Sequence, residues 1–114
     1  MIAVIFEVIP HAEHKQEYLD IAASLRPELE KIDGFISIER FQSLQDPNKL
    51  LSLSFYENED ALDQWRNVEK HRMAQTIGRN KIFEAYRIRI VSVIRDYTMS
   101  ARDQAPADSQ SLHD

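Results

Sequence analysis

The segment between Trp65 and Arg79 combines aromatic, cationic and amide side chains at helical spacing. On a helix that advances about 100° per residue, five of its residues fall within one arc of roughly 80°: Trp65, Val68, Arg72, Gln75 and Arg79. Two cations can hold a carboxylate or a phenolate, an amide can orient a carbonyl group, and an indole ring can form a flat wall for an aromatic ligand. The stripe therefore predicts either the border of a small-molecule pocket or a subunit contact in which the same cations form structural ion pairs.

His71 is the candidate general base of this segment. It lies about 120° round a regular helix from Trp65, so regular geometry keeps the two side chains apart. Its imidazole suits a general base or an axial haem ligand, and the alternative is a structural histidine held by a hydrogen bond. The other histidines have no second ligand at the i, i+4 spacing of a metal site, so no metal is expected.

A second group of charged residues recurs on the predicted strands: Glu7, Glu39, Arg87 and Arg89. Because side chains alternate across a strand, Arg87 and Arg89 share one face, as do Ser52 and Ser54 on another strand. We expect these polar groups to lie together across neighbouring strands. They predict either a polar cavity that binds a small oxygenated molecule, with Glu7 as a ligand contact, or an ion-pair network whose charges satisfy one another.

Composition and charge limit the classes of protein that this chain fits. Its 114 residues, 43% hydrophobic and 29% charged, suit one globular domain. The formal charge of -5 disfavours nucleic acid as a partner, and the absence of Cys excludes disulfides and thiolate chemistry, consistent with a cytoplasmic location. The apolar start over residues 1–9 meets Pro10 too soon for a signal peptide or a membrane span, so we expect a strand there and no membrane partner.

The hydrophobic periodicity predicts strands and helices in the order βαββαβ. A strand over residues 1–9 precedes a helix whose apolar stripe runs from residue 18 to 32 and which Gly34 stops. A hairpin follows, with strands over 35–43 and 50–57, and Asn58 caps a second helix that runs towards 78–83. The last strand covers 86–98. This order predicts an α+β, ferredoxin-like fold in which two helices cover one face of a four-stranded antiparallel sheet.

The other face of this sheet is too apolar in the first strand for open water and too mixed for a core. We expect it to carry Ile5, Glu7, Ser52, Ser54, Arg87 and Arg89. A second sheet laid over it would cover the apolar part, so we predict a homodimer whose two sheets enclose a barrel. The folded domain should span 1–98. The polar tail over 99–114 lacks apolar periodicity and is expected to be mobile.

Four segments together resemble the antibiotic biosynthesis monooxygenase family: GFISIERFQS, SLSFYENEDAL, WRNVEKHRMAQTIGR and FEAYRIRI. The resemblance covers the chain from Met1 to Tyr97 and implies a dimeric α+β barrel. The family includes cofactor-independent oxygenases of polycyclic phenols, quinol monooxygenases and haem-degrading monooxygenases, so the fold does not select the reaction.

Carried over residue by residue, the resemblance implies chemistry in which a deprotonated phenol reacts with dioxygen. Trp65 matches the helix tryptophan of those enzymes, His71 stands where an ionisable group can occur, and Arg87 matches an arginine of the last strand. Ala61 stands where they place an asparagine. The expected protein is a cofactor-independent monooxygenase of a phenolic or quinol-type aromatic compound, with Arg72 and Gln75 as further substrate contacts. The alternatives are a non-catalytic small-molecule-binding or stress-related dimeric barrel and, third, a haem-degrading monooxygenase.

Overall fold

A computed structural model describes the backbone of residues 1–75 and 82–109 and the side chains of residues 1–69 and 82–109. The predicted βαββαβ order is confirmed. Its elements are β1 (Ile2–Pro10), the 3₁₀ turn η1 (Ala12–His14), α1 (Lys15–Leu29), β2 (Phe35–Gln42), β3 (Leu50–Tyr56), α2 (Glu59–Gln75) and β4 (Phe83–Ser92).

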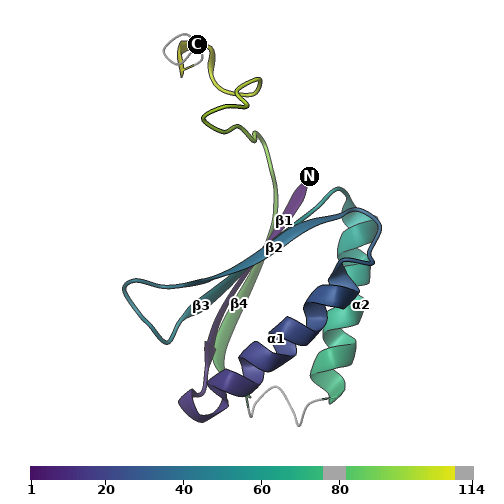
Figure 1. Cartoon of the computed structure of the whole chain (residues 1–114), viewed down its shortest axis with the longest axis vertical. Helices are drawn as coiled ribbons and strands as arrows, with labels where there is room; N and C mark the ends of the chain where they lie inside the picture. Colours follow the sequence, from purple (N-terminus) through teal and green to yellow (C-terminus); the bar gives the residue numbers. More distant parts are fainter. Residues whose placement is uncertain (76–81, 110–114) are drawn as a thin grey trace.

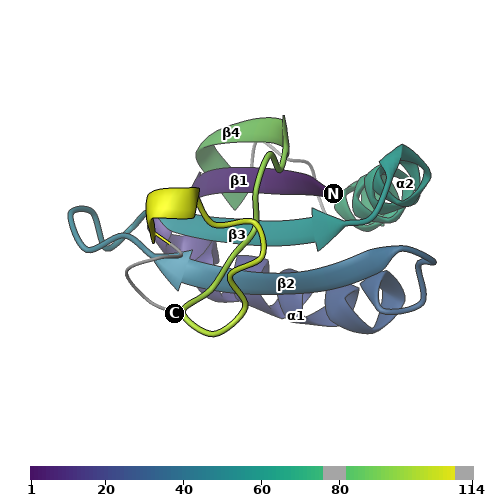
Figure 2. The ribbon, with the colours of Figure 1, turned by 90° about the horizontal axis from the view of Figure 1, so that it is seen from above.

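The strands form one antiparallel sheet in the order β2-β3-β1-β4, as Figure 2 shows from above. Helices α1 and α2 lie side by side on one face of this sheet, and no helix of the described part of the chain covers the opposite face (Figure 1). The predicted ferredoxin-like α+β class is therefore confirmed. No helix among the described residues is long and apolar enough to cross a membrane.

Strand β4 begins at Phe83 and ends at Ser92, whereas the sequence predicts a strand over 86–98. Its last pairing with β1 joins Ser92 to Ile2, and the backbone N–H of Val93 donates to the carbonyl of Met1 (3.0 Å). The β-branched residues that follow leave the sheet.

The register assigns each strand residue to one of two faces, because directly paired residues point the same way. Val4 pairs with Ser54, Phe6 with Ser52 and Val8 with Leu50, and all of these side chains point towards the helices. We call the opposite side the outer face. It carries Ala3, Ile5, Glu7, Ser37, Glu39, Phe41, Leu51, Leu53, Phe55, Arg87, Arg89 and Val91.

The expectation that Ser52 and Ser54 lie on the outer face is wrong. Both serines are buried on the helix side, where they lie between Leu50 and Tyr56 on the same face of β3. Both faces of β3 carry large apolar residues, so the alternation alone does not decide which face is covered. The Tyr56 side chain, fully buried in the core, fixes the choice.

Two adjoining apolar clusters fill the space between the sheet and the helices. One contains Tyr56, Trp65 and Leu29, and the other contains Val8 and Tyr18. The stripe predicted for the first helix is confirmed, since its buried residues all come from that stripe. α1 ends at Leu29, and Ile32 enters the core from the turn that follows.

Gly34 and Asn58 stand where β2 and α2 begin. Gly34 has φ +92°, in the left-handed region that favours glycine, and its carbonyl accepts a 2.7 Å hydrogen bond from the N–H of Glu57. The predicted cap is confirmed, because Asn58 Oδ1 accepts a 3.0 Å hydrogen bond from the N–H of Ala61. A Cβ added at Gly34 would lie 3.1 Å from the Cβ of Ala61, so the two backbones approach closely here.

The chain after β4 runs away from the sheet and the helices (Figure 1). Its described part, up to residue 109, folds on itself. The N–H of Asp96 donates to Gln104 Oε1 (2.7 Å), the Arg102 guanidinium lies 5.4 Å from the centre of the Tyr97 ring, and Ala105 is buried. The mobility of the tail stays a prediction.

Candidate ligand cavity between the helices and the sheet

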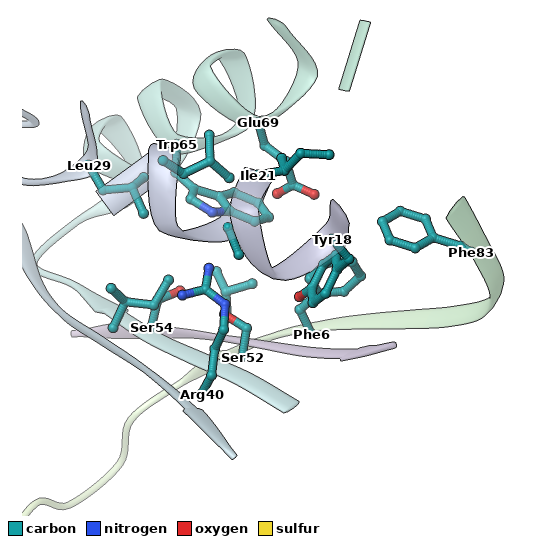
Figure 3. Close-up of a pocket in the computed structure, with 14 residues that line it drawn as sticks. Phe6, Tyr18, Ile21, Leu29, Arg40, Ser52, Ser54, Trp65, Glu69 and Phe83 are labelled. Carbon is teal, nitrogen blue, oxygen red and sulfur yellow. The ribbon is translucent and has the colours of Figure 1, made fainter. Parts of the chain in front are cut away.

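A cavity lies between the two helices and the covered face of the sheet (Figure 3). The interior volume that the centre of a water molecule can reach is about 40 Å³, enough for about three waters. Most of its lining is apolar and comes from both core clusters. Five polar side chains interrupt that lining: Tyr18, Arg40, Ser52, Ser54 and Glu69.

Trp65 forms part of the cavity wall from α2 and is 7% exposed. It lies one turn after Ala61 and three residues before Val68, at the spacing that keeps all three on the core face of the helix. Its indole packs at a tilt of 55° on Tyr56, with ring centres 6.4 Å apart. The sequence-based expectation of a pocket between the second helix and the sheet, with Trp65 as its wall, agrees with this position.

Arg40 supplies the cation of the sheet wall. It pairs directly with Ser52 across β2 and β3, and Figure 3 shows its guanidinium rising from the sheet into the cavity. Its Nε is buried and has no hydrogen-bond partner among the described residues. A buried charged donor without a partner is unfavourable. The Nε–H of Arg40 is therefore placed to donate a hydrogen bond to an acceptor from outside the described chain.

The two buried tyrosines stay neutral over a wide pH range. Burial raises the pKa of the Tyr18 hydroxyl, the nearby Arg40 guanidinium opposes that shift, and the Glu69 carboxylate adds to it. Burial also raises the pKa of Tyr56 to about 12, against a smaller opposing effect of the Ser54 hydroxyl. Tyr18 can therefore donate a proton in a hydrogen bond to a ligand oxygen at neutral pH.

The structure separates some of the predicted site residues. Glu7 and Arg87 are paired neighbours on the outer face, so they do not meet Trp65. Glu7 instead lies 3.4 Å from Arg89 Nη1 and 3.4 Å from Lys49 Nζ, as in the predicted alternative of an ion-pair network. His71, Arg72, Gln75 and Arg79 lie outside the residues whose side chains the structure describes. No group of acidic and histidine side chains that could hold a metal ion occurs among the described residues.

Sequence reasoning missed Arg40 and Glu69 as site residues, and it placed the predicted polar cavity with Ser52 and Ser54 on the wrong face of the sheet. A β-bulge between Phe35 and Ser37 reverses the alternation of β2 and turns Arg40 towards the helices. No glycine or turn residue marks that bulge. Glu69 could have been predicted as a site residue, because it follows Trp65 by four residues and therefore shares its helix face.

The topology and the helix-covered cavity define a ferredoxin-like α+β protein with its candidate site between helices and sheet. Residues 1–76 match the model of the antibiotic biosynthesis monooxygenase family. The chain belongs to this family, and the family predicted from the sequence is confirmed. The matched part contains Arg40 and Trp65, and it ends before β4.

Known relatives agree with this assignment. The chain is 44% identical over 113 residues to a protein of Pyricularia oryzae named jasmonate monooxygenase ABM, with 91% of this chain and 53% of the relative covered. It is 27% identical over 62 residues to the uncharacterized protein YqjZ of Bacillus subtilis, with 54% of this chain and 53% of the relative covered. The chain thus spans about half the length of the curated relatives it matches.

Solved structures share the fold. Rv0793 of Mycobacterium tuberculosis superimposes with a TM-score of 0.73 over 85% of this chain and 98% of that one, at 16% identity. At this identity the likeness concerns the fold alone.

Proposed function

We propose that this protein is a monooxygenase that oxidises a small organic molecule in the cavity beside Trp65, without an organic cofactor or a metal. Its family and its 44% identity to a protein named as a monooxygenase support the reaction class. The observation that carries the site is the cavity between the helices and the sheet, in which the indole of Trp65 and the guanidinium of Arg40, whose Nε is buried, face the same space. In such a site an ionised substrate is stabilised while bulk water is kept out.

The proposed substrate is a phenolic or quinol-type aromatic compound. Such a compound supplies both electrons of the reaction itself: it takes one oxygen atom of O₂ as a carbonyl group, and the other oxygen leaves as water with the two hydrogens that the substrate loses. No external reductant is needed. Arg40 would stabilise the phenolate that precedes the reaction with oxygen, and Trp65 would contact the ring.

A jasmonate-like carboxylate is the second candidate, and the 44% identical relative favours it. Hydroxylation of a carbon in such a molecule consumes two further electrons, because one oxygen atom is reduced to water. This candidate therefore requires an added reductant, which separates it experimentally from the phenolic one.

Oxygen uptake by the purified protein tests the proposal. We expect uptake with at least one member of a panel of naphthols and quinols, or with jasmonic acid plus a reductant, and transfer of one ¹⁸O atom from labelled O₂ into the product. Trp65→Phe and His71→Ala should each lower the rate at least tenfold, and Arg66→Gln, an exposed site on α2, should not.

Three outcomes would contradict this assignment. A substrate turned over equally well by the Trp65→Phe and His71→Ala variants would place the site elsewhere. Ligand binding with no oxygen uptake for any compound would favour the non-catalytic alternative. A Soret shift on addition of haemin would support the haem-degrading alternative instead.

A further inference from the structure

We propose that the sheet wall of the cavity is a carboxylate-binding subsite, formed by Arg40, Ser52 and Ser54, for a small organic acid with an apolar body. This inference rests on the proposed function only in taking the cavity as the substrate site. Binding of the acid does not itself require oxygenation.

Three donors on two adjacent strands form the subsite. Arg40 and Ser52 are directly paired across β2 and β3, and Ser54 is the next residue of β3 on the same face. Ser54 is 1% exposed and Ser52 is 7% exposed, so neither hydroxyl is solvated from the surface. Buried hydroxyls beside the buried Nε of a guanidinium strengthen the binding of an anion, because the local dielectric constant is low.

The unpartnered Nε of Arg40 indicates what kind of acceptor fits. A guanidinium presents parallel N–H groups that match the two oxygens of a carboxylate, whereas a phenolate offers a single oxygen. Because the Nε proton has no acceptor in the described chain, a carboxylate would satisfy it without breaking an existing hydrogen bond at that atom. A carboxylate therefore fits this guanidinium with two hydrogen bonds, whereas the phenolate of the proposed reaction fits it with a single oxygen.

The opposite wall orients the ligand. Glu69 faces the cavity from α2, while Arg40 and the serines rise from the sheet (Figure 3). A carboxylate is repelled by the Glu69 side and attracted by the sheet side. The apolar body then lies along the remaining lining, against Trp65 and the α1 residues Ile21 and Leu25.

The cavity volume sets how such a ligand enters. About 40 Å³ accommodates the carboxylate head, since it equals the space of about three waters. An apolar body of jasmonate size displaces lining side chains. Ile21 and Leu25 are only half-buried, so their movement is the least costly way to enlarge the space.

Trp65 is the only tryptophan of the chain, so its fluorescence reports on this cavity alone. The probes are jasmonic acid and its methyl ester, which differ by one negative charge at pH 7. We expect the acid to bind at least tenfold more tightly than the ester, the usual effect of a charge-assisted hydrogen bond. Arg40→Gln should weaken binding of the acid at least tenfold and leave that of the ester unchanged, while Arg40→Lys should retain part of the preference.

Controls keep the outcome specific. Arg66→Gln removes one exposed positive charge from α2 and should change neither affinity, and circular dichroism establishes that each variant is folded. The subsite is overturned if Arg40→Gln leaves the affinity for the acid unchanged, or if neither jasmonic acid nor hexanoic acid binds at millimolar concentration. It is also overturned as a carboxylate site if calorimetry finds that 2-naphthol loses as much affinity as the acid in Arg40→Gln. If the protein binds jasmonic acid more tightly than its methyl ester but consumes no oxygen, the proposed function is refuted and the carboxylate subsite is supported.

Discussion

Among single residues, Tyr56 combines complete burial with an unsatisfied hydroxyl. Its side chain is 0% exposed, and the hydroxyl has no hydrogen-bond partner of normal geometry among the described residues. A buried hydroxyl in that state costs stability, whereas the ring contributes by packing against Phe35 and Trp65. The residue therefore stabilises the core through its ring and destabilises it through its oxygen.

Tyr56→Phe should accordingly stabilise the protein by about 1 kcal/mol at pH 7, because it removes the unsatisfied hydroxyl and keeps the ring. Urea unfolding monitored by circular dichroism measures the change. Tyr86→Phe is the matched control, since Tyr86 is 48% exposed. A destabilisation of Tyr56→Phe similar to that of a lost hydrogen bond would show that the hydroxyl is satisfied in solution.

The same residue gives a signed pH dependence. The folded-state pKa of Tyr56 is raised from 10.0 to about 12. The contribution of the neutral Tyr56 hydroxyl to the free energy of unfolding is therefore fully present below pH 10 and is lost as the pH rises towards 12. Over that interval the loss amounts to about 3 kcal/mol. Urea unfolding between pH 9 and pH 12 should therefore show a steeper alkaline loss for the wild type than for Tyr56→Phe. Equal slopes would contradict the raised pKa.

At the scale of elements, α2 depends on the cap that positions Trp65. Asn58→Ala removes the acceptor of the Ala61 N–H and should cost about 0.5–2 kcal/mol. Asn58→Asp keeps an oxygen at the same place and should cost much less. Thermal unfolding measures both, and a melting temperature equally lowered in the two variants would argue against the cap.

The helices and strands differ in how well the sequence predicts them. The order of elements, the α1 stripe and the Asn58 cap follow from local patterns that few alternatives satisfy. Local patterns do not predict which side chains of β2 and β3 point towards the helices. Apolar residues occur on both sides of each strand, and the bulge after Phe35 leaves no local signal in the sequence. For this reason the sequence predicted Trp65 as a site residue and missed Arg40. Trp65 lies on a helix with a clear apolar stripe, whereas Arg40 lies on a strand that has no clear apolar face.

At the scale of the whole molecule, no helix or strand among residues 1–75 and 82–109 covers the outer face. It combines half-buried and exposed apolar side chains, such as Leu53 and Phe41, with the ion pairs around Glu7. A continuous face of this kind is unfavourable in water and suits a second copy of the chain, whose own outer face offers the same mixture of apolar and paired charged groups. We therefore expect a homodimer in which the two outer faces meet.

Phe41→Glu tests this arrangement. Phe41 is 42% exposed in the single chain, so the substitution should leave the fold intact while burying a charge in the dimer contact. We expect the wild type to sediment as a dimer at micromolar concentration and Phe41→Glu to dissociate at least tenfold more readily. Leu44→Glu, at a fully exposed position of the β2–β3 loop, is the control and should remain dimeric. A monomeric wild type would contradict the expectation.

The contact between Gly34 and Ala61 has a consequence for how this sequence can change over evolutionary time. Ala61 is 0% exposed, and its Cβ would lie only 3.1 Å from a Cβ added at Gly34, so each position limits the size of the side chain at the other. The asparagine that the family resemblance places at position 61 carries three more heavy atoms than alanine. We therefore expect the two positions to be coupled in evolution, so that a larger side chain at one of them favours a compensating change at the other.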